Sequence, residues 1–212
     1  MSLRIKICGL TRAEDIDCAV QAGADAIGFV FYPASPRYIP PEAALPLIRR
    51  LPPFVASVGL FVNAAHADVK AALSAAPLDI LQFHGDESPE DCARWRRPYL
   101  KAVRMRPGVN LLEYAATFSG ARALLLDTFT EKYGGSGKPF DWTLIPPDLP
   151  LPVVLSGGLA PDNVADAIRR ARPAAVDVSS GVEAAKGVKA PEKIRAFILA
   201  ARAAAQEIEA ST

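Results

Sequence analysis

The sequence predicts one (β/α)₈ barrel domain that spans residues 1–212. Short apolar runs alternate along the chain with segments of helical spacing, which is typical of parallel strands joined by helices. Eight such units follow one another with no composition break or linker. Eight units close into a barrel more readily than they extend as an open sheet. The last two apolar runs each enter a glycine turn, as strands of such barrels often do at one end.

The strands follow in order from the apolar runs. We expect them at residues 4–8, 26–31, 56–62, 80–84, 100–105, 123–128, 152–156 and 174–179. Ala26–Phe31 is almost continuously apolar, as expected for a parallel strand that is buried on both faces. An open doubly wound sheet is the alternative fold, but its Gly-x-Gly-x-x-Gly turn does not match Cys8-Gly9-Leu10 after the first strand.

Helix start signals lie between these runs. Thr11 and Glu14 fit a capping box. Asn63 can cap the third helix, and Ser88-Pro89 combines a cap with a proline at the first helical position. Pro161 is expected at the first position of the helix after the seventh strand. The last helix opens at residues 190–192 and is predicted to turn inward the side chains of Ile194, Phe197, Ile198 and Ala201.

The net charge, the lengths of the apolar runs and the numbers of cysteines and histidines argue against several classes of function. A net charge of +1 gives no general attraction to nucleic acid or to an anionic membrane, and no apolar run approaches the ~20 residues of a membrane span. Cys8, Cys18 and Cys92 are too widely spaced for a metal motif or a disulfide framework. The presence of only two histidines argues against a zinc site. We therefore expect a cytoplasmic protein without a signal peptide.

The two glycine turns, Ser156-Gly157-Gly158 and Ser179-Ser180-Gly181, follow neighbouring strands. Glycine lets a backbone approach a ligand closely, and the N–H groups of such turns favour an anion. The loops after the last two strands of these barrels frequently hold phosphate. We therefore predict that Gly157, Gly158, Ser180 and Gly181 bind phosphate, with ordinary tight turns as the alternative.

Polar residues at the carboxyl ends of the strands are the candidates for chemistry, because such barrels build their active sites there. The candidates are Cys8, Arg37, Gln82, His84, Asp127 and Asp177. Residues two apart on a strand share a face, so Lys6 with Cys8, and Gln82 with His84, can point into the barrel together.

Each candidate has a simpler alternative. Cys8 and Asp127 can act as an acid–base pair if a cation such as Lys6 lowers the pKa of the thiol, but most free cysteines are small buried hydrophobes. Asp127 closes an apolar run and is costly to bury without a partner or a role. Arg37 on its proline-rich loop suits a carboxylate or a phosphate, or is a solvated loop arginine. His84 by itself is more often structural.

A glycine-rich loop, residues 134–137, follows the sixth strand. It fails the phosphate-loop pattern, because Pro139 follows Lys138 where Ser or Thr belongs. We predict a lid that excludes water from the site.

Short motifs spread over nearly the whole chain support a more specific assignment. They are KICGLT at 6–11, GFVF at 28–31, SPR at 35–37, GLFVN at 59–63, LQFHG at 81–85, LD at 126–127, GGSG at 134–137, FDW at 140–142, LSGGL at 155–159 and DVSSGVE at 177–183. In this order the set resembles the phosphoribosylanthranilate isomerase family of tryptophan biosynthesis.

The resemblance implies an aldose–ketose isomerase that carries out an Amadori rearrangement. Its substrate would be N-(5-phosphoribosyl)anthranilate and its product 1-(2-carboxyphenylamino)-1-deoxyribulose 5-phosphate. Asp127 would be the general acid that opens the sugar ring, and Cys8 the general base that removes the C2 proton. Arg37 would bind the anthranilate carboxylate, while Gln82, His84 and Asp177 would line the pocket. The iminium intermediate is its own electron sink, so no metal or other cofactor is implied. The phosphosugar is the expected partner of a monomer or homodimer.

Three alternatives stay open at this point. The related isomerase family of histidine biosynthesis performs the same rearrangement on a larger, doubly phosphorylated substrate, but it uses aspartates as both acid and base, and Cys8 argues against it. A ribulose-phosphate epimerase would need paired His and Asp metal ligands. A catalytically silent phosphate-binding barrel would be favoured if Cys8 or Asp127 were missing, and both are present.

Overall fold

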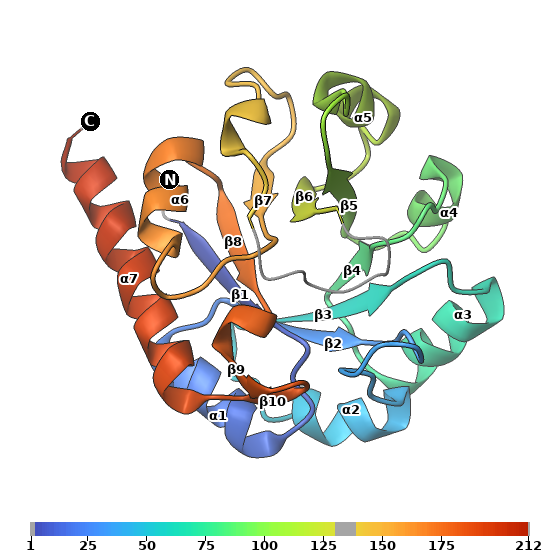
Figure 1. The fold of residues 1–212 in the computed structure, drawn as a ribbon. Coiled ribbons are helices and arrows are strands. Elements are labelled where there is room, and N and C mark those ends of the chain that lie inside the picture. The colour runs from blue at the N-terminus through green and yellow to red at the C-terminus, as the bar shows by residue number, and fades with distance from the viewer. Residues whose placement is uncertain (1–2, 130–138, 212) are drawn as a thin grey trace.

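The eight predicted strands close into a parallel barrel. A computed structural model describes residues 3–129 and 139–211 of the chain. Each strand pairs with the next, and β1 pairs with β8 to complete the ring (Figure 1). The strands are β1 Arg4–Cys8, β2 Ala26–Val30, β3 Ala56–Phe61, β4 Ile80–Phe83, β5 Tyr99–Met105, β6 Ala123–Thr128, β7 Val153–Leu155 and β8 Ala175–Val178. The predicted fold class is therefore confirmed, with strand ends that differ by a residue or so.

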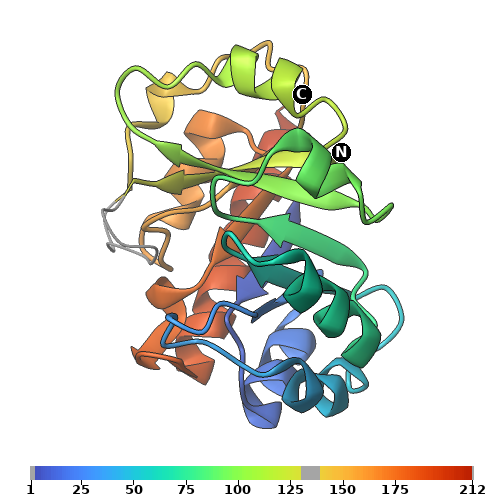
Figure 2. The same ribbon diagram turned by 90° about the vertical axis from the view of Figure 1, so that its right-hand side faces the viewer.

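Helices lie outside the strands, as the turned view also shows (Figure 2). They are α1 Ala13–Ala22, α2 Pro41–Ile48, α3 His66–Ala75, α4 Pro89–Ala93, α5 Leu111–Thr117, α6 Val164–Ala171 and α7 Pro191–Ala210. Between β6 and β7 the described residues contain only a 3₁₀ turn, Trp142–Leu144. The predicted lid at 134–137 lies outside the described residues. None of the described helices is long and apolar enough to cross a membrane.

Strand alternation decides which side chains face the barrel interior. Leu124 and Leu126 of β6 join the apolar cluster that α5 covers, whereas Leu125 joins a separate cluster made by neighbouring strands. Asp127 continues the phase of Leu125 and so turns inward. The same rule on β1 sends Ile5 and Ile7 toward the helices, as predicted.

The predictions for the helices after β4 and β8 are confirmed. Ser88 caps α4 as predicted, since its hydroxyl accepts the Asp91 N–H at 3.1 Å. Pro191 occupies the first turn of α7, and the predicted inward face of that helix is buried. Near the middle of α7, Arg202 donates to the Leu3 carbonyl at 2.6 Å and so ties the helix to the start of the described chain.

Two predicted caps are wrong because the side chains bind elsewhere. The Thr11 hydroxyl donates to the Gly187 carbonyl at 3.4 Å, and α1 begins after Arg12 without a side-chain cap. The Asn63 side chain accepts the Asp86 N–H at 2.7 Å, so it ties two loops together instead of capping α3.

The helix α6 begins later than predicted. Pro161 lies in a turn and not at the first helical position, since α6 starts at Val164. The Asn163 side chain accepts the Ala160 N–H and donates to the Gly158 carbonyl, both at 2.9 Å. These bonds close the turn before the helix and hold the loop that follows β7.

A hairpin that the sequence analysis did not predict lies between β8 and α7. After the 3₁₀ turn Ser180–Val182, the strands β9 Glu183–Ala185 and β10 Val188–Lys189 pair antiparallel (Figure 1). Its turn at Gly187 has a φ of +80°, and a Cβ there would lie 2.8 Å from the Pro36 carbonyl oxygen. The hairpin therefore packs against the loop after β2, which carries Arg37.

Candidate active site

A pocket lies at the carboxyl ends of the strands. All the predicted site residues except Gly181 line it: Cys8, Arg37, Gln82, His84, Asp127, Gly157, Gly158, Asp177 and Ser180. Gly181 lies behind the wall, and a Cβ there would overlap the Leu159 carbonyl. Its role in this arrangement is to let the turns after β7 and β8 touch.

Part of the pocket wall was missed from the sequence. Three apolar residues, Val30, Leu60 and Val62, line it together with Tyr32. Val30 lies two residues after Gly28, and Leu60 lies two residues after Val58. Residues two apart on a strand point to the same side, so strand alternation could have identified both as facing the barrel interior. An apolar and aromatic wall of this kind suits a flat ring in the ligand.

A buried ion pair underlies the thiol of Cys8. Lys6 and Asp177 are paired in register across β1 and β8, and Lys6 Nζ lies 2.9 Å from Asp177 Oδ1. Burial opposes the charge on Lys6, but the Asp177 carboxylate outweighs it and raises the pKa of Lys6. Asp177, predicted to touch the substrate, thus has a protein partner for its carboxylate.

The Cys8 thiol is neutral in this environment. Burial raises the pKa of Cys8 more than the neighbouring Lys6 lowers it, and Asp177 raises it further. Lys6 therefore lowers the pKa of the thiol, as expected, but by less than burial raises it. The Gly28 backbone provides the room for the thiol, since a Cβ there would lie 2.8 Å from Cys8 Sγ.

Asp127 is held by two hydrogen bonds. Its Oδ1 accepts the Thr128 N–H at 2.8 Å, and its Oδ2 lies 3.1 Å from His84 Nε2. The other ring nitrogen of His84 lies 2.9 Å from Gln82 Nε2. Gln82 is fully buried, and its Oε1 has no hydrogen-bond partner. A chain of contacts from Gln82 through His84 therefore orients the Asp127 carboxylate.

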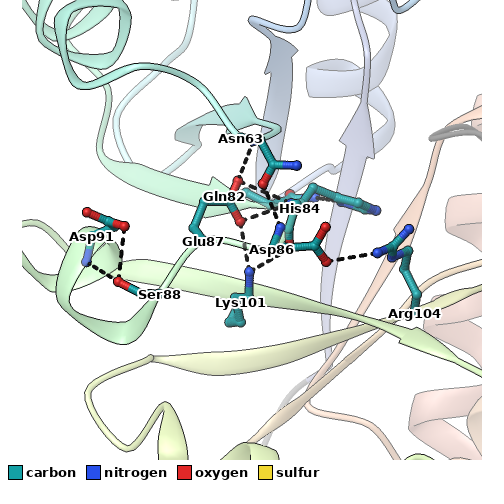
Figure 3. A network of polar contacts seen from close by, with 10 residues as sticks. Asn63, Gln82, His84, Asp86, Glu87, Ser88, Asp91, Lys101 and Arg104 are labelled. Carbon is teal, nitrogen blue, oxygen red and sulfur yellow. Dashed lines mark hydrogen bonds and ion pairs between the residues drawn. The ribbon is translucent and has the colours of Figure 1, made fainter.

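A second buried ion pair fixes the loop that follows His84 (Figure 3). Lys101 Nζ donates to the Gly85 carbonyl at 2.7 Å and to Glu87 Oε2 at 2.8 Å. The Glu87 carboxylate also accepts the N–H groups of Gly85 and Asn63. Because Gly85 is the next residue in the chain, this network holds the backbone from which His84 reaches Asp127.

The glycine turn after β7 has a left-handed backbone. Gly157 and Gly158 have φ angles of +80° and +67°. A Cβ at Gly157 would lie 2.8 Å from Asp127 Oδ1, so the turn can pass this close only as glycine. Within the described part of the chain, the N–H groups of Gly157, Gly158 and Ser180 donate to no protein atom. They are available to an anionic ligand.

Arg37 has a protein partner that the sequence analysis missed. Its Nε and Nη2 donate to the two oxygens of Glu183 at 2.6 and 2.9 Å. In the sequence, Glu183 is only the last residue of the DVSSGVE motif. The short hairpin that carries it has no recognisable strand pattern. As for metal sites, no group of three or more His, Cys, Asp or Glu in 3–129 and 139–211 could hold an ion.

Comparison with known proteins then identifies the family. A family model described as N-(5'phosphoribosyl)anthranilate (PRA) isomerase matches residues 5–200. The chain belongs to this family. The N-(5'-phosphoribosyl)anthranilate isomerase of Dechloromonas aromatica is 62% identical over 98% of this chain and 100% of the relative. The PRA isomerase family was the resemblance found in the sequence, which is thus confirmed over the histidine-pathway and epimerase readings.

Solved structures of PRA isomerases share the fold. The crystal structure of the Thermotoga maritima enzyme superposes with a TM-score of 0.87 at 47% identity, over 95% of this chain and 99% of that one. A related complex holds reduced 1-(o-carboxyphenylamino)-1-deoxyribulose 5-phosphate, at 43% identity, TM-score 0.81 and the same coverage. Monomers generated from the dimeric Thermotoga maritima enzyme also match, with a TM-score of 0.81 at 42% identity over 95% of this chain and 99% of that one. This chain is an isomerase enzyme built on the same barrel.

Removing the cation of the second buried pair should destabilise the barrel. In Lys101→Met the Glu87 carboxylate stays buried without its cation, which typically costs about 3–5 kcal/mol. Urea unfolding measures the loss. Glu207→Gln, which breaks the exposed Arg169–Glu207 pair, is the control and should cost less than about 1 kcal/mol. Equal losses in the two variants would contradict the buried-pair explanation.

The raised pKa of Cys8 predicts slow alkylation of the ligand-free protein. Iodoacetamide attacks through the thiolate, whose fraction grows as the pH approaches the pKa. The Cys8 rate, followed by mass spectrometry of its peptide, should keep rising up to a pH of about 9 without a plateau. A rate that levels off near neutral pH would mean that the thiolate forms without substrate.

Proposed function

We propose that this chain converts N-(5'-phosphoribosyl)anthranilate into 1-(2-carboxyphenylamino)-1-deoxyribulose 5-phosphate, with Asp127 as general acid and Cys8 as general base. The observation that carries the proposal is one pocket, in a chain of this family, that gathers the thiol, the carboxylate and the two glycine turns. As the family resemblance implies, the reaction belongs to tryptophan biosynthesis.

The first step is opening of the sugar ring. Asp127 gives a proton to the ring oxygen, the bond between that oxygen and C1 breaks, and the nitrogen lone pair forms a C1 iminium. The hydrogen bonds from Thr128 and His84 fix the direction in which Asp127 delivers the proton. A positioned acid of this kind typically contributes ~10²–10⁴ in rate.

His84 can accompany both protonation states of Asp127. When Gln82 donates to His84 Nδ1, the proton lies on Nε2 and is donated to the ionised carboxylate. Rotation of the Gln82 amide by half a turn presents its unpartnered Oε1 to Nδ1–H instead. His84 Nε2 can then accept a hydrogen bond from a neutral Asp127, which keeps its proton until the ring oxygen takes it. We propose that Gln82 and His84 act on the substrate through Asp127.

The second step is removal of the C2 proton. The Cys8 thiol first releases its own proton to water, and the thiolate Sγ then takes the C2 proton. The C2–H electrons form the C1–C2 double bond, and the iminium electrons return to nitrogen. The product of this step is an enolamine, which becomes the ketone by losing the hydroxyl proton and gaining one at C1. The iminium places a positive charge near the thiol, and a neighbouring opposite charge favours the thiolate. The acid step therefore creates the conditions for the base step.

The ends of the substrate have separate binding groups. The free N–H groups of Gly157, Gly158 and Ser180 suit the phosphate, and Gly181 keeps the two turns together. Arg37 suits the anthranilate carboxylate. The aromatic ring would lie against the apolar wall. Asp177 contributes by holding Lys6.

The proposal also covers the cofactor requirement, the cellular location and the oligomeric state. Because the iminium accepts the electrons, we propose that neither a metal nor an organic cofactor takes part. A cytoplasmic location is supported by the three free cysteines. We propose a monomer or a homodimer, and the dimeric Thermotoga maritima relative supports the homodimer.

Loss of the acid or the base should abolish most of the activity. Cys8→Ser and Asp127→Asn are each expected to cut kcat at least ~100-fold, because each removes one proton transfer. Turnover is followed by the loss of substrate fluorescence in chelator-dialysed protein, with Cys18→Ser as the matched control. Near-wild-type kcat in either variant would remove that residue from its role, and activity that returns only with added metal would contradict the cofactor-free mechanism.

Loss of Arg37 should mainly weaken substrate binding. In Arg37→Ala we expect KM to rise at least ~10-fold with a smaller change in kcat, because the carboxylate is bound in both the ground state and the transition state. The fold should survive, since Glu183 keeps Lys189 as a partner. An unchanged KM and kcat/KM would place the carboxylate elsewhere.

A further inference from the structure

Arg37 reaches the pocket with one edge of its guanidinium already occupied. The Nε and Nη2 groups donate to Glu183 in a two-pronged contact, and both side chains are almost completely buried. Among the described residues, Nη1 has no protein partner. Because the guanidinium is planar and rigid, fixing one edge fixes the direction of the other.

Glu183 is itself held from the opposite side. Lys189 Nζ lies 3.0 Å from Glu183 Oε1, and Lys193 Nζ donates to the Glu183 carbonyl at 2.8 Å. The Lys189 side chain is completely buried. Burial raises the pKa of Glu183, but the contacts from Arg37 and Lys189 outweigh it and hold that pKa below its usual value. The carboxylate therefore stays charged between two cations.

The same lysine reaches the backbone of the catalytic thiol. Lys189 Nζ donates to the Ser179 carbonyl at 3.0 Å, and the Ser179 hydroxyl donates to the Cys8 carbonyl at 3.0 Å. The hairpin of β9 and β10 thus contacts the loops after β1, β2 and β8. Nothing in the barrel requires this extra hairpin, because β8 already closes the ring with β1.

Charge gives Lys189 a further role. Arg37 and Glu183 cancel each other, so the pair alone would not attract an anion. Burial lowers the pKa of Lys189, although the contact with Glu183 opposes this shift. While Lys189 is protonated, the three groups carry one net positive charge beside the pocket. A carboxylate that approaches Arg37 therefore still meets a cationic group.

We infer that Glu183, held by Lys189, is a positioning residue that turns the free edge of Arg37 toward the substrate carboxylate. The hairpin would thereby determine specificity for a substrate whose aromatic ring carries that carboxylate. The inference rests on the proposed function, in which Arg37 binds this group. Without Glu183, the Arg37 side chain would be free to adopt other rotamers, and the carboxylate would lose its fixed partner.

The test compares two ligands on three proteins. One ligand is the reduced 1-(o-carboxyphenylamino)-1-deoxyribulose 5-phosphate, and the other is the same compound without the carboxylate. In the wild-type protein, the ratio of their Kd values should be at least about tenfold. In Glu183→Gln and in Arg37→Ala, the ratio should fall below about threefold. The inhibition constant of inorganic phosphate should stay unchanged in both variants, because the glycine turns are intact.

A second variant covers the case in which Glu183→Gln does not fold, since that change leaves Lys189 buried without a counter-charge. The double variant Glu183→Gln, Lys189→Gln removes both charges. Its ratio of the two Kd values should also fall below about threefold. Glu207→Gln, which breaks an exposed Arg–Glu pair, is the matched control and should keep the wild-type ratio.

Three results would overturn the inference in distinguishable ways. If the Kd ratio stays at the wild-type value in Glu183→Gln but falls in Arg37→Ala, Arg37 binds the carboxylate without help from Glu183. A wild-type ratio in Arg37→Ala would remove both the inference and the proposed role of Arg37. Loss of phosphate inhibition together with a fall in the Kd ratio in Glu183→Gln would show that Glu183 supports the whole pocket and does not specifically position Arg37.

Discussion

The buried ion pair between Lys6 and Asp177 is the interaction on which the pocket depends. It joins β1 to β8 where the barrel closes, and removal of either partner would leave an uncompensated charge inside the barrel. The pair also acts on Cys8. Burial raises the pKa of Cys8 more than Lys6 lowers it, and Asp177 adds to the rise, so the thiol stays neutral. In the proposed mechanism the thiolate forms when the substrate becomes an iminium cation, so the acid step by Asp127 precedes the base step by Cys8.

The fold could be predicted in its main features, because buried parallel strands leave a strong pattern of apolar runs and β1 to β8 alternate with helical segments. The helix starts were less predictable. Thr11 and Asn63 have the residue types of caps, but each bonds to a distant loop that no local pattern reveals. The hairpin of β9 and β10 was missed for a related reason. Its strands are only three and two residues long, and short segments carry no measurable periodicity.

Most of the candidate site could also be located from the sequence, since the end of a strand fixes where its last inward side chain points. Cys8, Gln82 and Asp127 were found in this way. The side-chain partners of the site residues could not be predicted. The partners of Arg37 and Asp177, and the support that Glu87 and Lys101 give to His84 (Figure 3), depend on contacts between loops far apart in the chain. The net shift of the Cys8 pKa could not be predicted either, because burial raises this pKa more than Lys6 lowers it.

The central claim is that protonation by Asp127 must precede removal of the C2 proton by Cys8. The most direct measurement follows the release of deuterium into water from substrate labelled at C2, using the Asp127→Asn variant with Cys8 intact. The account predicts that this variant releases no deuterium above the uncatalysed rate, while the wild-type protein releases it as product forms. Release at the wild-type rate by Asp127→Asn would show that Cys8 removes the proton without the iminium, and would contradict the coupling of the two steps.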